Sequence, residues 1–342
     1  MHSQVERQFR NRTEAKSVRA KAVSVAARHQ GDIALPAIVY AIVVNLAFFY
    51  NLALVYRGAV SLTFGVCFGS VIAYFCMAPL HDSVHGVING RHRGLRWLNP
   101  VIGYMSCIPS FWNYHAFKLL HLHHHRYVND PEQDPDVFFA RQPKVLAPLA
   151  SLLGLGSIIG QAVRLSKQTG DKLPACSRMI QILVLAALIS AASVFWDFGA
   201  QLAALTLLPP VFATATVYFM QGWLPHHRFV EPEKIPEKVV IAKYPKVLEP
   251  LLNFLSNGQI YHLYHHAFPG VPFHRYGSAY KAMTAVIGDS LPIADWKVSA
   301  ELNNRINQAN RAKNLAVMDK KANGAAKAVG YLRSEDRELD YA

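Results

Sequence analysis

The chain has 342 residues, of which 52% are hydrophobic and only 17% are charged, and its formal net charge is +13. Soluble domains usually carry about 25% charged residues, so this composition favours a protein surrounded by lipid. No nucleic-acid-binding motif is present, so we expect no nucleic-acid partner. Basic loops on the cytoplasmic side of a membrane explain the positive charge more simply. The four cysteines form no CxxC pair, so we expect buried, reduced thiols and no iron–sulfur or zinc site built from them.

Residues 1–32 form a basic N-terminal segment, which we expect to be an amphipathic helix on the membrane surface. It lacks the apolar stretch of a cleaved signal peptide. Four later segments are long enough to cross a bilayer, which takes about 20 apolar residues. These segments are 33–56, 59–80, 178–197 and 200–223.

Short links join the first two segments and the last two, which predicts two helical hairpins. Their tips hold only Arg57 and Asp197, whereas the leader, the 81–177 region and the C-terminal part hold nearly all Lys and Arg. The positive-inside rule therefore places both termini and the middle segment in the cytoplasm.

Two weaker apolar stretches, 97–112 and 145–164, are interrupted by Pro109 and Pro148. We expect them to lie in the membrane interface as helices. The tail 299–342 is charged and Ala-rich, which is typical of a surface helix followed by disorder.

Twelve of the sixteen histidines fall at four places along the chain, all at or beyond the predicted cytoplasmic helix ends. Residues three and four apart share one face of a helix, so each of the larger sets can present its imidazoles together. The four places are His81 and His85; His121, His123, His124 and His125, with His115 upstream; His226 and His227; and His262, His265 and His266.

The three spaced sets offer eight of these rings and the 226–227 pair adds one, which exceeds what one metal ion can use, whereas two ions with four or five nitrogens each would use all nine. Neutral imidazole suits iron, zinc and copper. A zinc hydrolase needs only three protein ligands and a general base such as the Glu of HExxH, and no Glu lies inside these sets. Iron that changes oxidation state can activate O2, which favours oxidation of a lipid C–H bond. A histidine-rich metal-binding membrane protein without enzymatic activity is the alternative.

Three motifs carry a family resemblance: HDSVHG at 81–86, HLHHHRYVNDPEQDPD at 121–136 and YHLYHHAFPGVPFHRY at 261–276. In this order they resemble the membrane histidine-box family of fatty acid desaturases, related hydroxylases and carotenoid ketolases. The resemblance covers roughly residues 60–280. It implies an all-α integral membrane fold, with four transmembrane helices in two hairpins and a cytoplasmic helical cap that holds a di-iron site.

The resemblance also implies a domain division and a ligand set. The catalytic domain would be 33–298, between the leader 1–32 and the tail 299–342. His226 is implied as one iron ligand, with His227 as its alternative. His123 is an extra histidine of the second box, and we assign no role to His115 or His274. The implied iron ligands are His81, His85, His121, His124, His125, His226, His262, His265 and His266. Metal-bound imidazoles usually donate their other N–H to a carboxylate or carbonyl, and the candidates here are Asp82, Asp134, Asp136 and Asn257.

The implied reaction is O2-dependent desaturation of a fatty acyl chain by two iron ions. HDxxHG and Trp-Leu-Pro-His also resemble carotenoid ketolases, so ketolation or hydroxylation of a carotenoid stays open, as does hydroxylation of another lipid or of an alkane. The substrate would come from the bilayer, and its headgroup or carrier is not specified by the sequence. Electrons would come from a donor such as a ferredoxin with its reductase, docked on basic residues: Arg91, Arg93, Arg96, Lys118 and Arg126.

Overall fold

The computed structural model describes residues 20–226 and 247–287, and these residues form helices and turns without a β-strand among them. The all-α prediction is therefore confirmed for this part of the chain. Residues 20–28 are helical, in agreement with the expectation for the end of the basic leader. The rest of that leader up to residue 19, His227 and the tail 299–342 lie outside the described residues, so the three-part domain division stays a prediction.

Four helices are long and apolar enough to cross a membrane, as predicted, and their mean hydropathy lies between 1.7 and 2.2. They run from Leu35 to Tyr56 (α2), Leu62 to Val84, Leu173 to Trp196 (α10) and Gly199 to Trp223. The second consists of α3 (Leu62–Phe75) and α4 (Met77–Val84). The fourth consists of α11 (Gly199–Val217), which contains two prolines, and the π-helical turn η2 (Tyr218–Trp223).

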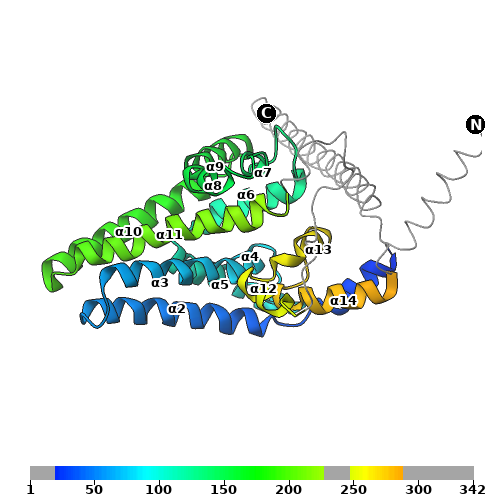
Figure 1. Ribbon diagram of the computed structural model, residues 1–342, viewed down its shortest axis with the longest axis horizontal. Coiled ribbons are helices and arrows are strands. Elements are labelled where there is room, and N and C mark those ends of the chain that lie inside the picture. Colours follow the sequence, from blue (N-terminus) through cyan, green and yellow to red (C-terminus); the bar gives the residue numbers. More distant parts are fainter. Residues whose placement is uncertain (1–19, 227–246, 288–342) are drawn as a thin grey trace, which may run out of the picture. The chain divides into compact units, whose positions relative to one another are not determined.

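These helices lie side by side in the order α10, α11, α3 and α2 (Figure 1). The outer helix α10 has 6% of its most apolar window buried, against 50% for the α3–α4 helix. Its exposed side chains are large and apolar, for example Leu183, Leu188 and Val194. A helix that is apolar all round and stays exposed fits a lipid environment rather than water.

Small residues let the two inner helices approach each other. A Cβ added at Gly65 of α3 would lie 2.9 Å from Leu205 of α11, and one at Gly69 would lie 3.0 Å from Pro209. Small residues four apart are a common device for close helix packing in membranes. Asn51 of α2 donates to the backbone oxygen of Gly65 at 2.8 Å, which ties the third helix to this pair.

Shorter helices complete the described part of the chain at one end of the long ones (Figure 1). The N-terminal set comprises η1 (Arg93–Leu95), α5 (Leu98–Ser110), α6 (Tyr114–Tyr127), α7 (Val137–Ala140), α8 (Ala147–Leu153) and α9 (Leu155–Thr169). The C-terminal set comprises α12 (Glu249–Leu255), η4 (Gln259–Tyr261), α13 (His262–Ala267), η5 (Phe273–Arg275) and α14 (Tyr276–Ile287). Helices α8 and α9 meet at an angle of 55° at Gly154, within the stretch for which we predicted an interfacial helix.

The core beneath the histidines packs the short helices onto the long ones. Its buried side chains come from α3 and α4, α5, α6 and α11, and include Met77, Leu80, Cys107, Phe117 and Val217. The cysteines are all free, as expected, but only Cys76 and Cys107 are buried. The expectation of burial was wrong for Cys67 and Cys176, which are exposed on apolar helices.

Candidate metal centre

Four elements bring the predicted histidine ligands to one place. The first box ends the second long helix, with His81 on α4 and His85 at its C-terminal cap. The second box lies on α6, which begins where the Asn113 side chain accepts the backbone N–H of Ala116 at 2.8 Å. His226 follows η2, and the third box occupies α13. The nine rings form two groups of converging nitrogens.

Five histidines form the first group, called here the five-histidine group: His81, His85, His121, His125 and His265. One ring nitrogen of each lies within 4.8 Å of the others. The Nε2–Nε2 distances are 2.8 Å for His85–His121, 3.1 Å for His125–His121, 2.9 Å for His81–His265 and 2.8 Å for His265–His125. All five rings therefore point their Nε2 atoms at a common centre.

The second group, called here the four-histidine group, consists of His124, His226, His262 and His266. Its Nε2 atoms also converge, at 2.9 Å for His226–His262, 3.0 Å for His266–His262 and 3.4 Å for His124–His266. The two groups are neighbours, because the His125 and His266 rings stack with their centroids 4.3 Å apart.

Helix geometry explains how the second and third boxes divide between the groups. Successive residues turn by about 100° on a helix of 3.6 residues per turn, so the i+4 residue lies about 40° to one side of residue i. The i+3 residue lies about 60° to the other side. Accordingly, His121 and His125 enter the five-histidine group and His124 enters the other. The third box divides in the opposite sense, with His262 and His266 in the four-histidine group and His265 in the five-histidine group.

The donor set fits metal ions. His124 Nδ1 lies 2.8 Å from an Asp134 oxygen, and His262 Nδ1 lies 2.5 Å from the Gln259 amide oxygen. A ring that donates its Nδ1–H to such an oxygen has a lone pair on Nε2. Lone pairs that converge without a proton between them repel, and a cation removes that repulsion. For metal–nitrogen bonds of about 2.1 Å, two nitrogens bound at right angles lie about 3.0 Å apart, which matches the observed spacings.

Burial keeps most of these rings neutral, which is the form that binds metals. Burial lowers the pKa of His85, His121, His125, His262, His265 and His266 well below the usual 6.5.

His124 is the exception. Burial acts to lower its pKa, but the carboxylates of Asp134 and Asp136 outweigh burial and raise the pKa to about 9. Conversely, burial acts to raise the pKa of Asp134, and His124 outweighs it and lowers that pKa. Burial raises the pKa of Asp136 to about 7; His124 opposes this rise, and the neighbouring Asp134 carboxylate adds to it.

The four predicted orienting residues lie at different distances from the rings. Asp134 accepts from His124, and Asp136 lies 3.7 Å from the same nitrogen. Asp82 lies 3.8 Å from His81 Nδ1, beyond hydrogen-bond range, and accepts instead from the backbone N–H of Phe273. Asn257 pairs with the Tyr40 hydroxyl and the Tyr74 backbone oxygen.

Sequence reasoning missed two partners of the rings. Gln259 accepts from His262, and the Tyr276 hydroxyl lies 2.7 Å from His265 Nδ1. Gln259 precedes His262 by three residues, so the spacing of the two residues could have predicted their contact. Tyr276 is eleven residues from His265, and no pattern in the sequence connects the two.

The remaining histidines of the described residues lie outside both groups. His123 packs on Tyr127 with ring centroids 4.5 Å apart, and His115 pairs with the Tyr104 hydroxyl at 2.6 Å. His274 lies beside Phe273.

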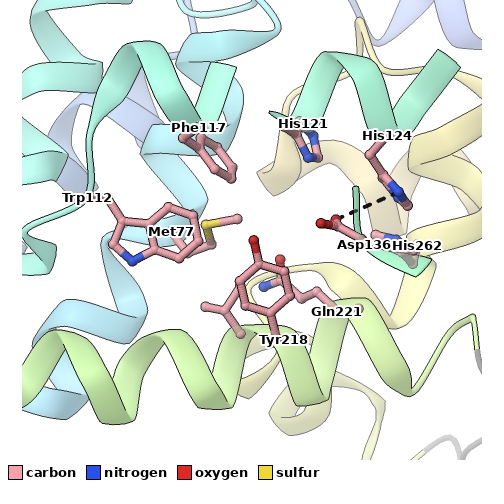
Figure 2. Close-up of a pocket in the computed structure, with 11 residues that line it drawn as sticks. Met77, Trp112, Phe117, His121, His124, Asp136, Tyr218, Gln221 and His262 are labelled. Atoms are coloured by element: carbon pink, nitrogen blue, oxygen red, sulfur yellow. Dashed lines mark ion pairs between the residues drawn. The ribbon is translucent and has the colours of Figure 1, made fainter. Parts of the chain in front are cut away.

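A cavity of about 30 Å³ lies between the two histidine groups and the core. Figure 2 shows its two walls: Met77, Trp112 and Phe117 on one side, and His121, His124 and His262 on the other. The rest of the lining consists of Asp136, Val217 of α11, and Tyr218, Gln221 and Gly222 of η2. The cavity therefore places an apolar surface opposite imidazoles of both groups.

Comparison with known proteins agrees with this site. The family model for fatty acid desaturase matches residues 56–296, which is most of the chain. An sn-1 oleoyl-lipid 12-desaturase from Picosynechococcus sp. is 32% identical over 54 residues, which make up 16% of this chain and 14% of that relative. This chain therefore belongs to the fatty acid desaturase family.

Proposed function

We propose that this protein is a membrane oxidoreductase that introduces a double bond into a fatty acyl chain, using O2 and two iron ions. The observation that carries the proposal is the convergence of nine imidazoles into two adjacent groups beside an apolar cavity. Family membership supports the same reaction class.

The five-histidine group would hold one iron ion and the four-histidine group the other. Bound iron would supply the redox chemistry with O2 that an unactivated C–H bond requires. The overall reaction removes two hydrogens from adjacent carbons and yields two waters from O2, two electrons and two protons. Asp134 and Gln259 would hold their imidazoles with Nε2 turned to the ion, which is the usual role of such partners.

The apolar wall of the cavity would bind the reacting methylenes. Met77, Trp112 and Phe117 offer no hydrogen bond to water at that wall, so an acyl chain would displace water from beside the imidazoles. The Trp112 indole N–H is already satisfied by Thr214 at 2.8 Å, which fixes the ring across the cavity. These residues would position the carbon, because errors on the order of 1 Å strongly alter reactivity.

We further propose that the four long helices are two transmembrane hairpins with the histidine groups in a cytoplasmic cap. The α3–α4 helix has 23 residues, which corresponds to about 34 Å at 1.5 Å per residue and exceeds a hydrocarbon core of about 30 Å. Its histidine end and its Leu62 end would therefore face opposite sides of the membrane. The excess of Lys and Arg outside the helix links favours the cytoplasm for the histidine end.

The proposed substrate is an acyl chain of a membrane lipid, in keeping with the lipid named for the matched relative. The electron donor would be an acidic redox protein such as a ferredoxin, served by its own reductase. Exposed basic side chains near the histidine end, including Arg93, Arg96, Lys118 and Arg126, would receive it.

Expression in a host without related activities tests the function. The host would receive a redox donor and a carotenoid precursor, and total lipids would be compared by mass spectrometry with a strain that carries His265→Ala. An acyl product lighter by two hydrogens, absent from the mutant, is the expected result. A carotenoid heavier by one oxygen, or by one oxygen less two hydrogens, would replace desaturation by hydroxylation or ketolation. Purified wild-type protein without iron would refute the di-iron site.

A further inference from the structure

Tyr276 is the first residue of α14, and its side chain reaches the five-histidine group. Its hydroxyl oxygen lies 2.7 Å from Nδ1 of His265, and both residues have an exposed fraction of 0%. On the other edge of the His265 ring, Nε2 lies 2.9 Å from Nε2 of His81 and 2.8 Å from that of His125. One ring thus joins the tyrosine to the centre of the group.

The direction of the tyrosine–histidine hydrogen bond decides what Nε2 can do. A neutral imidazole carries one proton, on either Nδ1 or Nε2. When Nδ1–H donates to the Tyr276 oxygen, Nε2 has a free lone pair. When the tyrosine O–H donates to Nδ1, the proton must sit on Nε2 and blocks metal binding. A metal ion bound by Nε2 of His265 therefore requires Tyr276 to be the acceptor.

Asp82 holds the backbone from which Tyr276 projects. Both carboxylate oxygens of Asp82 accept the N–H of Phe273, at 3.1 and 3.2 Å. Phe273 begins the turn η5, which leads directly into Tyr276. Asp82 also adjoins His81, so the contacts form a closed ring: His81, Asp82, Phe273, Tyr276, His265 and back to His81. The ring links the first histidine box to the third.

We propose that Tyr276 is a positioning residue for the five-histidine group, and that Asp82 holds it in place through the backbone of Phe273. Tyr276 accepts the Nδ1–H of His265 and thereby turns the Nε2 lone pair of that ring toward the ion. This inference rests on the proposed di-iron function.

The test is Tyr276→Phe, which removes only the acceptor oxygen. Partners of this kind usually account for about 10–100-fold in metal affinity, so competition with a metal-buffering chelator should show a loss of that size at one of two sites. Mössbauer spectra of the ⁵⁷Fe-loaded protein should show a changed signal for one iron and an unchanged signal for the other. The matched control is Tyr264→Phe in the same box, because the buried Tyr264 hydroxyl has no hydrogen-bond partner within the described residues.

Asp82 has its own pair of variants. Asp82→Asn keeps an oxygen for the Phe273 N–H and should retain most of the affinity, whereas Asp82→Ala should reproduce the loss seen with Tyr276→Phe. Equal losses in Asp82→Asn and Asp82→Ala would show that the charge matters rather than the backbone bond, and would overturn the role given to Asp82.

Wild-type affinity and spectra in Tyr276→Phe would overturn the inference, and so would equal changes at both irons, which indicate general loosening. If Tyr276→Phe does not accumulate, Asp82→Ala tests the same contact, because it releases the backbone of Phe273 from which Tyr276 projects. It should weaken one site, and an unchanged affinity would contradict the proposal. Wild-type protein that binds no metal would instead overturn the proposed function, and the inference with it.

Discussion

At the scale of single residues, His124 differs from its neighbours in the charge around it. Its Nδ1 faces the buried Asp134 at 2.8 Å and the partly buried Asp136 at 3.7 Å. A carboxylate in this position fixes the tautomer and makes the imidazole a stronger base, which favours a metal ion and a proton alike. The four-histidine group should therefore bind metal in competition with one proton, whereas the five-histidine group should not.

Replacing Asp134 by Asn should weaken metal binding to the four-histidine group by about 10–100-fold. The measurement is a chelator-buffered Co²⁺ titration at pH 9. At lower pH the metal must displace a proton from His124 in the wild type but not in the variant, and this difference would partly hide the weaker binding. Asp130→Asn is the matched control, since Asp130 lies in the same loop and its side chain accepts the backbone N–H groups of Glu132 and Gln133 rather than a histidine. Equal affinities for Asp134→Asn and wild type would refute the role of the carboxylate.

The raised pKa of His124 predicts a pH dependence. In the metal-free protein this pKa is about 9, above the ordinary value of 6.5. Its contribution to folding stability is thus fully present below pH 6.5 and is lost as the pH rises through about 9. Metal must displace the same proton, so affinity at one site should rise about tenfold per pH unit up to pH 9. Co²⁺ titrations between pH 7 and 9 should show this slope in wild type and not in Asp134→Asn.

At the scale of elements, the approach of α4, α5 and α6 determines where two histidine boxes meet. A Cβ at Gly103 of α5 would lie 2.3 Å from a Tyr114 ring carbon and 2.7 Å from the Ser83 hydroxyl. Tyr114 begins the helix of the second box, and Ser83 lies between the histidines of the first. The absence of a side chain at position 103 therefore sets the distance between these helices.

Gly103→Val should push the two box helices apart and lower metal occupancy at both groups. Overpacking of this kind costs about 1–3 kcal/mol, so the protein should remain in the membrane with a lower unfolding temperature. Metal content and thermal unfolding in detergent measure the two effects. Gly160→Val on α9 is the control, because a Cβ there meets nothing within 4 Å. Normal metal content in Gly103→Val would contradict the argument.

Much of this arrangement could be predicted from apolar segments and histidine spacing, and the failures have physical causes. The second predicted span ends at residue 80, but the helix that contains it continues to Val84, where the polar residues Asp82 and Ser83 are buried by protein. The spacing predicted that each box shares one stripe, but it could not show that the second and third boxes are each divided between two centres. Contacts between distant segments, such as Tyr276 with His265, leave no periodic signal in a single sequence.

At the scale of the whole molecule, the two ends of the long helices differ in the positive charge that they expose. Arg57 lies exposed in the link after α2, whereas Arg93 and Arg96 lie exposed around η1, after the first histidine box. Electrostatic attraction speeds the encounter of proteins and weakens as salt rises. We therefore expect an acidic electron donor to bind the surface that carries Arg93 and Arg96.

Replacing Arg93 and Arg96 by Gln should raise the KM for a ferredoxin-type donor and reduce the salt dependence of turnover. Turnover by the wild type should fall steeply between low and physiological salt. Arg57→Gln is the control for removal of an exposed positive charge and should behave as wild type. Salt-independent turnover by the wild type would eliminate this docking surface.

The sidedness of the membrane gives the last prediction. Single cysteines at Arg57 and Lys144, introduced after removal of the four native cysteines, report the two ends of the helices, because both positions are exposed. A membrane-impermeant maleimide should label the first in intact cells and the second only after permeabilisation. The reverse pattern would place the histidine groups outside the cytoplasm, where soluble cellular donors cannot reach them. Labelling of both in intact cells would mean that the α3–α4 helix does not separate the two sides, and the hairpin arrangement would then be wrong.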